Sequence, residues 1–370
     1  MRKIAYYISD YGYGHAARSA AIIQRWIEED KELSVVICHF FALDFLKGFL
    51  TDERIFFRDV QTDIGYVLEK DSIMPDVTAL TRKFNTFIYS WPKRIAEEAA
   101  FLNGENIDLV LSDISPIAFE AASSAGIPSA GISNFTWYSA YEDMVDREKL
   151  EPFRKAYSKM TYQIRLAGSR EENWSDGGDI EAGFFSRKVD WEETDRIKRS
   201  LNQQADQHII FFGLGMKIDV GSLNQLPLWR SENCHFIVSH NTNIEGRNIT
   251  RIPRDYMNSQ NYIAAADLAI TKAGWGTIGE CITGNTPLLI IDRPCMAEDQ
   301  NTISYLLQYQ LCRTMEWEKF ERFKITDSFV HSLKQELHNS SYEKKDELGN
   351  IILALKNILA NTEEKRVSLV

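Results

Sequence analysis

The sequence lacks the features of an exported, membrane-spanning or nucleic-acid-binding protein. Its five cysteines are scattered singly with no CxxC pair, which fits a reducing compartment and neither a disulfide framework nor a zinc site. No run approaches the roughly 18 apolar residues that span a bilayer, and the short apolar run after Lys3 does not suit a signal peptide. The formal net charge of -11 disfavours attraction to nucleic acid. We therefore expect a cytoplasmic protein without a transmembrane segment or a nucleic-acid partner.

The length and the alternation of apolar and amphipathic stretches indicate two α/β domains. A chain of 370 residues exceeds what one core usually organises. Buried strands are expected at 3–9, 33–40, 107–113, 128–133, 208–215, 235–240, 267–274 and 287–292, with helical stretches between them. This rhythm is typical of βαβ units and parallel sheets, so we expect two Rossmann-like domains. The expected divisions are an N-terminal domain at 1–165, a linker at 166–184, a second domain at 185–340, and a C-terminal helix and tail at 341–370.

Notable residues follow the ends of the expected strands. Ligands of open parallel sheets bind at the carboxyl ends of the strands. His15 follows the first strand, and Asp113 ends a later one. In the second half, Gly213 and Gly215 follow the first strand, and the segment 272–277 follows another. Two such domains facing each other would form a cleft lined by these loops.

The segment "ITKAGWGTIGE" (270–280) has the pattern of an anion-binding turn. Gly274 and Gly276 would let the backbone approach a ligand, and a helix starting near Thr277 would offer N–H groups and a partial positive charge. Lys272 adds a cation, and Glu280, one turn later, suits ribose hydroxyls. The same pattern also fits a plain strand-to-helix turn capped by Thr277, and spacing alone does not separate the two readings.

This segment, followed by "TPLLIIDRP" (286–294) and "EDQNT" (298–302), resembles the nucleotide-sugar signature of GT-B fold glycosyltransferases. It is similar to that of UDP-glycosyltransferases, of the peptidoglycan N-acetylglucosaminyltransferase and of the transferase-like half of arabinokinases. The resemblance implies the GT-B fold, with two facing Rossmann-like domains and an inter-domain cleft. It also implies a nucleotide-sugar that serves as a substrate, with no cofactor.

The resemblance assigns the donor-binding residues by position. They are Gly274, Gly276 and Thr277 for the diphosphate, Glu280 for the ribose, Asp299 and Gln300 for the sugar, the Ile252 backbone for the base, and Gly14, Gly213 and Gly215 in the loops. Lys272 stands where plant-type members carry a histidine, and it can still counter a diphosphate as a point charge. The tryptophan–proline–glutamine clamp for uracil is absent, which leaves UDP- and dTDP-sugars both open.

The stretch "GYGHAARS" (12–19) resembles the first loop of the same families, whose histidine is the general base in many inverting members. A neutral imidazole suits that task at cytosolic pH. Asp113 matches the aspartate that partners this histidine, and such a carboxylate fixes the tautomer. The alternatives are that His15 only lines a phosphate-facing loop and that Asp113 caps the helix starting near Pro116.

The leading prediction is an inverting, metal-independent glycosyltransferase that acts on an unknown acceptor, because no carboxylate pair reads as a DxD metal motif. The alternatives are a sugar-nucleotide epimerase or phosphorylase on the same fold, and a non-catalytic sugar-nucleotide-binding subunit. Arg18 is open between an anion contact and a surface position. Trp137 and Tyr138 are open between stacking on an acceptor and packing between the domains.

Overall fold

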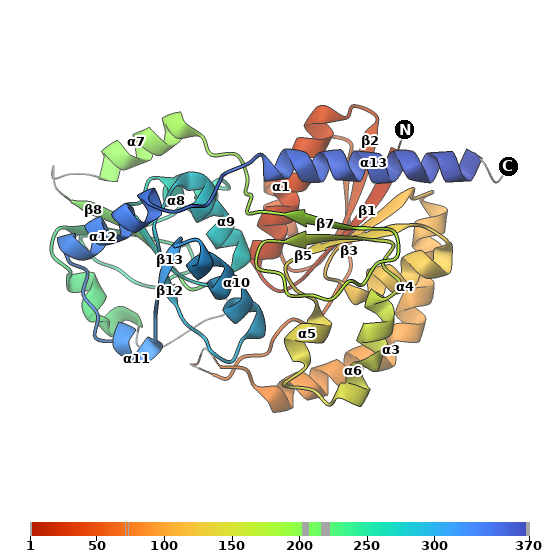
Figure 1. Cartoon of the computed structure of the whole chain (residues 1–370), viewed down its shortest axis with the longest axis horizontal. Helices are drawn as coiled ribbons and strands as arrows, with labels where there is room; N and C mark the ends of the chain where they lie inside the picture. The colour runs from red at the N-terminus through yellow and green to blue at the C-terminus, as the bar shows by residue number, and fades with distance from the viewer. Residues whose placement is uncertain (1, 71, 73, 202–206, 216–222, 368–370) are drawn as a thin grey trace. The chain divides into compact units, whose positions relative to one another are not determined.

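The computed structural model describes residues 2–70, 72, 74–201, 207–215 and 223–367. The chain divides into two compact units, which Figure 1 colours from red to blue along the sequence. The first unit comprises Met1–Val67, Pro75–Gly183 and Asp346–Val370, and the second comprises Leu68–Met74 and Phe184–Lys345. Each unit is built on one parallel sheet, which confirms the predicted α/β class.

The first unit contains a seven-stranded sheet in the order β3-β2-β1-β4-β5-β6-β7. Its strands are β1 (Arg2–Ile8), β2 (Leu33–His39), β3 (Ile55–Asp59), β4 (Leu109–Asp113), β5 (Ser129–Ser133), β6 (Tyr162–Leu166) and β7 (Asp179–Ala182). The central strands are buried on both faces, which is why they read as continuous apolar runs. The strand order reverses between β1 and β4, where Ile8 pairs with Asp113.

Helices pack around this sheet in groups. They are α1 (Tyr13–Glu29), α2 (Leu43–Phe49), α3 (Val77–Gly104), α4 (Pro116–Ala125), α5 (Trp137–Tyr141), α6 (Arg147–Tyr157) and α13 (Glu347–Val367). Helix α4 packs against α3 and α6, while α1 packs against α13 (Figure 1). The helix α1 presents Ile22, Ile23, Trp26 and Ile27 to the interior, as the spacing of these residues predicts.

The C-terminal helix belongs to the first unit. We expected a helix at 342–361, and α13 begins later, at Glu347. Its buried residues pack toward α1 and β7, and Lys356 Nζ pairs with Glu29 Oε2 at 2.7 Å. Tyr342, which precedes the helix, instead accepts a hydrogen bond from the backbone N–H of Phe184 in the second unit.

The structure corrects the expected linker at 166–184. This stretch contains the edge strand β7, which pairs with β6, and the first unit extends to Gly183. Only one residue of β7, Ala182, is buried. An edge strand with so little apolar burial shows no alternating pattern, so the sequence resembled a polar connection there.

The second unit contains a six-stranded sheet in the order β10-β9-β8-β11-β12-β13. Its strands are β8 (His208–Gly213), β9 (Cys234–Val238), β10 (Ile249–Arg251), β11 (Leu268–Lys272), β12 (Leu288–Ile291) and β13 (Cys312–Met315). Its helices are α7 (Trp191–Leu201), η1 (Leu223–Gln225), η2 (Pro227–Arg230), α8 (Ser259–Ala264), α9 (Trp275–Gly284), α10 (Ala297–Gln308), α11 (Trp317–Phe320) and α12 (Asp327–His338). Here the order reverses between β8 and β11, where Gly213 pairs with Thr271.

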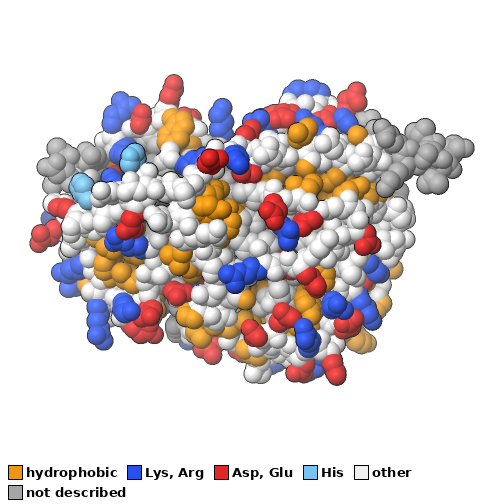
Figure 2. Space-filling model, viewed as in Figure 1, with side chains coloured by type: hydrophobic (Ala, Val, Ile, Leu, Met, Phe, Trp, Pro, Cys, Tyr) orange, Lys and Arg blue, Asp and Glu red, His pale blue; other side chains and the backbone are white. Residues whose placement is uncertain are grey.

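The surface carries both signs of charge. On the face drawn in Figure 2, basic and acidic side chains are interspersed with smaller apolar areas. Among the helices of the described chain, none combines the length and the apolar character that crossing a membrane requires.

Candidate functional site

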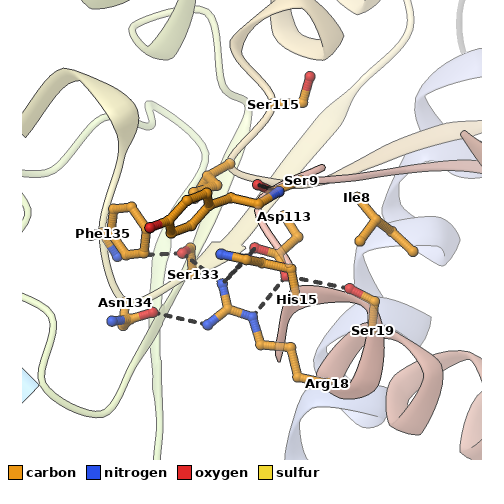
Figure 3. A network of polar contacts seen from close by, with 12 residues as sticks. Ile8, Ser9, His15, Arg18, Ser19, Asp113, Ser115, Ser133, Asn134 and Phe135 are labelled. Atoms are coloured by element: carbon orange, nitrogen blue, oxygen red, sulfur yellow. Dashed lines mark hydrogen bonds and ion pairs between the residues drawn. The ribbon is translucent and has the colours of Figure 1, made fainter. Parts of the chain in front are cut away.

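The first candidate site lies where the strand order of the first unit reverses. His15 stands in the first turn of α1, which follows β1, and Asp113 is the last residue of β4. His15 Nδ1 lies 2.9 Å from Asp113 Oδ1, although 98 positions separate the two residues in the sequence (Figure 3). The fold therefore brings this predicted pair together at the edge where parallel sheets bind ligands.

The backbone turns sharply after both of these strands. Gly12, which precedes α1, has φ 86° and ψ 177°, a region essentially restricted to glycine. Ile114, directly after Asp113, has φ 58°, which is a genuine outlier for a β-branched residue. The Tyr157 hydroxyl donates to the Ile114 carbonyl at 2.7 Å and so helps to hold this turn. Strained residues of this kind cluster at functional sites.

Arg18 is the principal partner of Asp113. Its Nε donates to Asp113 Oδ2 at 2.7 Å, and its Nη2 donates to Oδ1. The guanidinium also donates to Asn134 Oδ1 at 2.9 Å and to Ser133 Oγ at 3.0 Å, both just after or at the end of β5 (Figure 3). Arg18 is 3% exposed, so the surface position considered from the sequence is wrong. The Arg18 guanidinium binds both oxygens of a carboxylate of the protein itself, Asp113.

Asp113 is held as a carboxylate. Burial alone would raise its pKa, but the charges of Arg18 and His15 and their hydrogen bonds outweigh burial and place the pKa well below its ordinary value. Asp113 does not cap α4, because the N-cap residue is Ser115. The capping alternative is therefore wrong, and the carboxylate points toward Arg18 and His15 instead.

The two aromatic residues left open by the sequence belong to the interior of the first unit. Trp137 is fully buried, its indole N–H donates to Asp63 Oδ2 at 3.0 Å, and its ring packs edge-on against Tyr11. Tyr138 is 7% exposed and packs edge-on against Trp174 with ring centroids 5.5 Å apart. Neither of the two interpretations weighed from the sequence describes Trp137.

The second candidate site lies at the reversal of strand order in the second unit. Gly213 ends β8, and its carbonyl accepts a hydrogen bond from Thr271 Oγ1 at 2.7 Å. A Cβ added at Gly215, whose φ is +89°, would lie 3.1 Å from Lys272 Cε, and one at Gly274 would lie 3.3 Å from Lys272 Nζ. Glycine at both positions therefore makes room for the Lys272 side chain.

The helix α9 begins beside this lysine. Its N-cap residue is Gly274, which has no side chain to cap the helix, so Thr277 lies inside the first turn and is not the cap. Burial, and then the charge of Arg293, lowers the pKa of Lys272 to about 8. The amides of the helix N-terminus and the lysine make this end of the sheet electropositive.

Glu280 is held by a buried arginine. Its Oε1 accepts a hydrogen bond from Arg187 Nη2 at 2.6 Å, and both side chains are at least nine-tenths buried. Arg187 also donates to Ser259 Oγ at 3.1 Å and to the Met257 carbonyl. It thereby connects Glu280 to the stretch that follows Ile252, the residue whose backbone is predicted to contact the nucleotide base.

Asp299 has a similar partner. Arg293 Nε and Nη2 donate to its two oxygens at 2.6 and 2.8 Å, and each residue is 1% exposed. The neighbouring Gln300 donates from Nε2 to Asp292 Oδ1 at 2.6 Å. Asp299, which is predicted to hold sugar hydroxyls, is thus buried together with Arg293.

The remaining predicted residues occupy the same edges of the two sheets. The Ile252 N–H donates to the Val238 carbonyl at 2.9 Å, and Gly14 is the exposed second residue of α1. Gly276 is buried in the first turn of α9. Within the described ranges, the His, Cys, Asp and Glu side chains form no group of three or more that could hold a metal ion.

Sequence reasoning missed the arginine partners of the three carboxylates. No role was assigned to Arg187 or Arg293 from the sequence, and Arg18 was considered without Asp113 as its partner. Arg187 and Glu280 are 93 positions apart, so only the fold reveals their pairing. Arg293 and Asp299 are six positions apart, in the loop after β12 and in the first turn of α10. That spacing could have suggested the pair.

Comparisons with known proteins address the fold and the family of the chain. Residues 236–356 match the Glycosyltransferase family 28 C-terminal domain. Over 315 residues the chain is 25% identical to the L-arabinokinase of Arabidopsis thaliana, which covers 83% of this chain. The chain spans 30% of the length of that relative.

Solved structures of glycosyltransferases share the fold of the whole chain. Phytolacca americana UGT2, complexed with UDP-2fluoro-glucose and pterostilbene, matches with a TM-score of 0.60 at 10% identity, over 98% of this chain and 95% of that one. Streptomyces sp. SF2575 SsfS6, complexed with thymidine diphosphate, matches with a TM-score of 0.61 at 12% identity, over 96% and 100%. The chain thus has the GT-B fold, and its residues 236–356 match a domain of glycosyltransferase family 28.

Proposed function

We propose that this chain is an inverting, metal-independent glycosyltransferase that moves a sugar from a UDP- or dTDP-sugar to an acceptor hydroxyl. The second unit binds the donor, and the first unit supplies His15 as the general base. Both nucleotides are retained because the similar structures were solved with a UDP-sugar analogue in one case and with thymidine diphosphate in the other.

The donor assignment depends on charge. A diphosphate placed at the N-terminus of α9 meets backbone N–H groups, the helix dipole and the Lys272 ammonium. The glycines at 274 and 276 leave the backbone open to close approach. As the sugar leaves, negative charge grows on the diphosphate, and these fixed donors stabilise it without a metal ion.

The transfer step assigns one role to His15. The acceptor hydroxyl gives its proton to Nε2 as its oxygen bonds to the anomeric carbon. The bond from that carbon to the diphosphate oxygen breaks, and the electron pair leaves with the nucleoside diphosphate. Asp113 faces Nδ1 at 2.9 Å and stabilises the imidazolium that forms. Attack opposite the leaving group inverts the anomeric configuration.

The contact between His15 and Asp113 gives the proposal its main support. His15 is 8% exposed, so its ring is largely enclosed and yet reaches the surface. Asp113 is fully buried and ionised, and its Oδ1 lies at hydrogen-bond distance from Nδ1 of the ring. A histidine that only lined a loop would not require a buried, ionised partner.

A ligand screen followed by an activity assay tests the proposal. Nucleoside diphosphates and sugar nucleotides are added to the full chain while its melting is followed. A ligand at 100 times its Kd should stabilise the fold by about 2.7 kcal/mol. With the donor found, we expect acceptor-dependent release of nucleoside diphosphate, retained in EDTA, and a product of inverted configuration by NMR.

The other outcomes identify the rival functions. Conversion of the sugar nucleotide without an acceptor indicates an epimerase, and release dependent on phosphate indicates a phosphorylase. Binding without turnover across the acceptor panel supports a non-catalytic subunit. L-arabinose belongs in that panel, because the much longer plant relative is named for a kinase of this sugar.

A further inference from the structure

We propose that Arg18 is a positioning residue that shares the Asp113 carboxylate with His15 and thereby keeps His15 neutral, with its proton on Nδ1. The inference rests on the proposed role of His15 as the base. It goes beyond a histidine–aspartate pair, because the imidazole faces two charged groups, the Asp113 carboxylate and the Arg18 guanidinium, with opposed effects on its protonation.

The first support is the fixed geometry of the carboxylate. Arg18 binds both oxygens of Asp113 in a fork, from Nε to Oδ2 at 2.7 Å and from Nη2 to Oδ1. Such planar, bidentate pairs fix orientation as well as charge. Ser19 Oγ, one residue along α1, donates to Oδ2 at 3.4 Å. The plane of the carboxylate is therefore set by α1, the same helix that carries His15.

The second support is a count of protons. Arg18 Nη2 carries two hydrogens and lies within hydrogen-bond distance of Asp113 Oδ1, of Ser133 Oγ at 3.0 Å and of His15 Nδ1 at 3.0 Å. The two oxygens take the two hydrogens. Nδ1 must then bring its own proton to Asp113 Oδ1, because a lone pair there would face a carboxylate oxygen at 2.9 Å. The geometry therefore places the remaining lone pair of the ring on Nε2.

The third support is electrostatic. A carboxylate beside an imidazole favours the imidazolium, whereas a guanidinium nitrogen 3.0 Å from the same ring disfavours it. Asp113 paired with Arg18 presents His15 with almost no net charge. The ring therefore stays neutral until its Nε2 accepts a proton from the acceptor. Asp113 Oδ1 remains hydrogen-bonded to the Nδ1–H group throughout.

The other titratable groups around Asp113 do not compete for this role. Burial, and then the charge of Asp113, raises the pKa of Tyr6 on β1, and burial raises the pKa of Tyr157 on α6. Burial lowers the pKa of His39 on β2, and its Nε2 accepts a hydrogen bond from the Ala42 N–H. These groups stay neutral near pH 7, which leaves His15 as the group that Arg18 and Asp113 control.

NMR of the His15 ring nitrogens, recorded on the full chain without ligand, tests the inference. In the native protein we expect the Nδ1–H tautomer. In R18Q the Asp113 charge acts on His15 alone, so the titration midpoint of His15 should rise by about one unit or more. In R18K, which keeps the charge but loses the fork, the rise should be smaller. A midpoint in R18Q equal to the native one, or a native Nε2–H tautomer, overturns the inference.

A matched variant separates positioning from folding. R18Q leaves Asp113 buried with one fewer partner and is expected to be less stable, so thermal melting accompanies each titration. The double variant R18Q/D113N removes both charges and should titrate near the native midpoint, because the two effects on His15 cancel. If R18Q does not fold, R18Q/D113N and R18K still decide the question. A midpoint in the double variant as high as expected for R18Q contradicts the inference.

The activity profile distinguishes this inference from the proposed function. If His15 is the base, the acid limb of kcat/KM in R18Q moves upward with the NMR midpoint, and activity recovers at higher pH. A purely structural role of Arg18 predicts equal loss at every pH. If H15A retains turnover while the midpoint still moves in R18Q, the proposed function fails and the positioning role stands.

Discussion

Replacing Asp299 with asparagine should destabilise the second unit more than it weakens donor binding. Arg293 and Asp299 are each 1% exposed and are joined by two hydrogen bonds of 2.6 and 2.8 Å. D299N preserves the size of the side chain and removes its charge. The guanidinium of Arg293 then stays buried without this counter-ion, and breaking a buried pair in this way costs about 3–5 kcal/mol.

The expected change in melting temperature is large. For folding units of about 150–250 residues, 1 kcal/mol corresponds to about 2–4 °C, so D299N should lower the Tm of the second unit by about 6–20 °C. R293M should cost a similar amount, and R293M/D299L, which replaces the pair with apolar groups, should recover most of the loss. E336Q is the control, because the Arg313–Glu336 pair of the same unit is more than a third exposed and should contribute at most about 1 kcal/mol.

Urea and thermal unfolding of the full chain, followed by tryptophan fluorescence, measure these changes as a double-mutant cycle. Donor affinity is measured at a temperature at which every variant is folded. The reasoning is refuted if D299N melts like the native chain and loses donor affinity, because Asp299 would then serve the sugar and not Arg293.

Three further predictions concern the two strand reversals. Because the pKa of Lys272 is about 8, its ammonium is lost as the pH rises, so calorimetric diphosphate affinity should fall between pH 7 and 9. K272M should weaken that affinity by about 10–100-fold and abolish this pH dependence. The pKa of Asp113 is depressed by Arg18 and His15 despite burial. The Asp113 carboxylate therefore stabilises the fold fully at a pH above its ordinary pKa of about 3.9, and this contribution is lost as the pH falls below that value. D113N should therefore flatten the fall of the urea midpoint in acid. G12A should cost about 1–3 kcal/mol, because φ is 86° there. G104A, at the end of α3 with open space around it, should be neutral or stabilising by thermal melting.

The fold could be predicted where burial makes a strand apolar along its whole length. The runs at 3–9 and 107–113 became β1 and β4, because a central parallel strand is covered on both faces. The edge strand β7 has one buried residue and therefore left no pattern. The start of α13 was placed too early, because Tyr342 is apolar enough to extend the helical periodicity and yet packs against Phe184.

The candidate site could be predicted as far as its loops but not its electrostatics. His15 and Asp113 were found because His15 follows a strand, Asp113 ends one, and each resembles a family residue. The reversal of strand order brings them together. Pairing of Arg18 with Asp113 depends on a contact across 95 positions, and no local pattern encodes such a contact. An arginine in the second turn of a helix is equally compatible with a surface position and with a ligand-binding role until its partner is known.

The shared feature of the site carboxylates is therefore visible only in three dimensions. Asp113, Glu280 and Asp299 are each bound by a buried arginine. In a chain of net charge -11, bare carboxylates at these edges would repel a diphosphate. Pairing each with a guanidinium removes that repulsion, and under the proposed function Lys272 and the α9 N-terminus then attract the donor.

The most direct test of the account is to measure both donor affinity and transfer rate in H15A. The account predicts that the donor Kd stays within about threefold of the native value, while kcat falls by about 10²–10⁴-fold, the usual contribution of a general base. A variant that transfers sugar at the native rate would contradict the account, because no proton acceptor would then be needed at position 15.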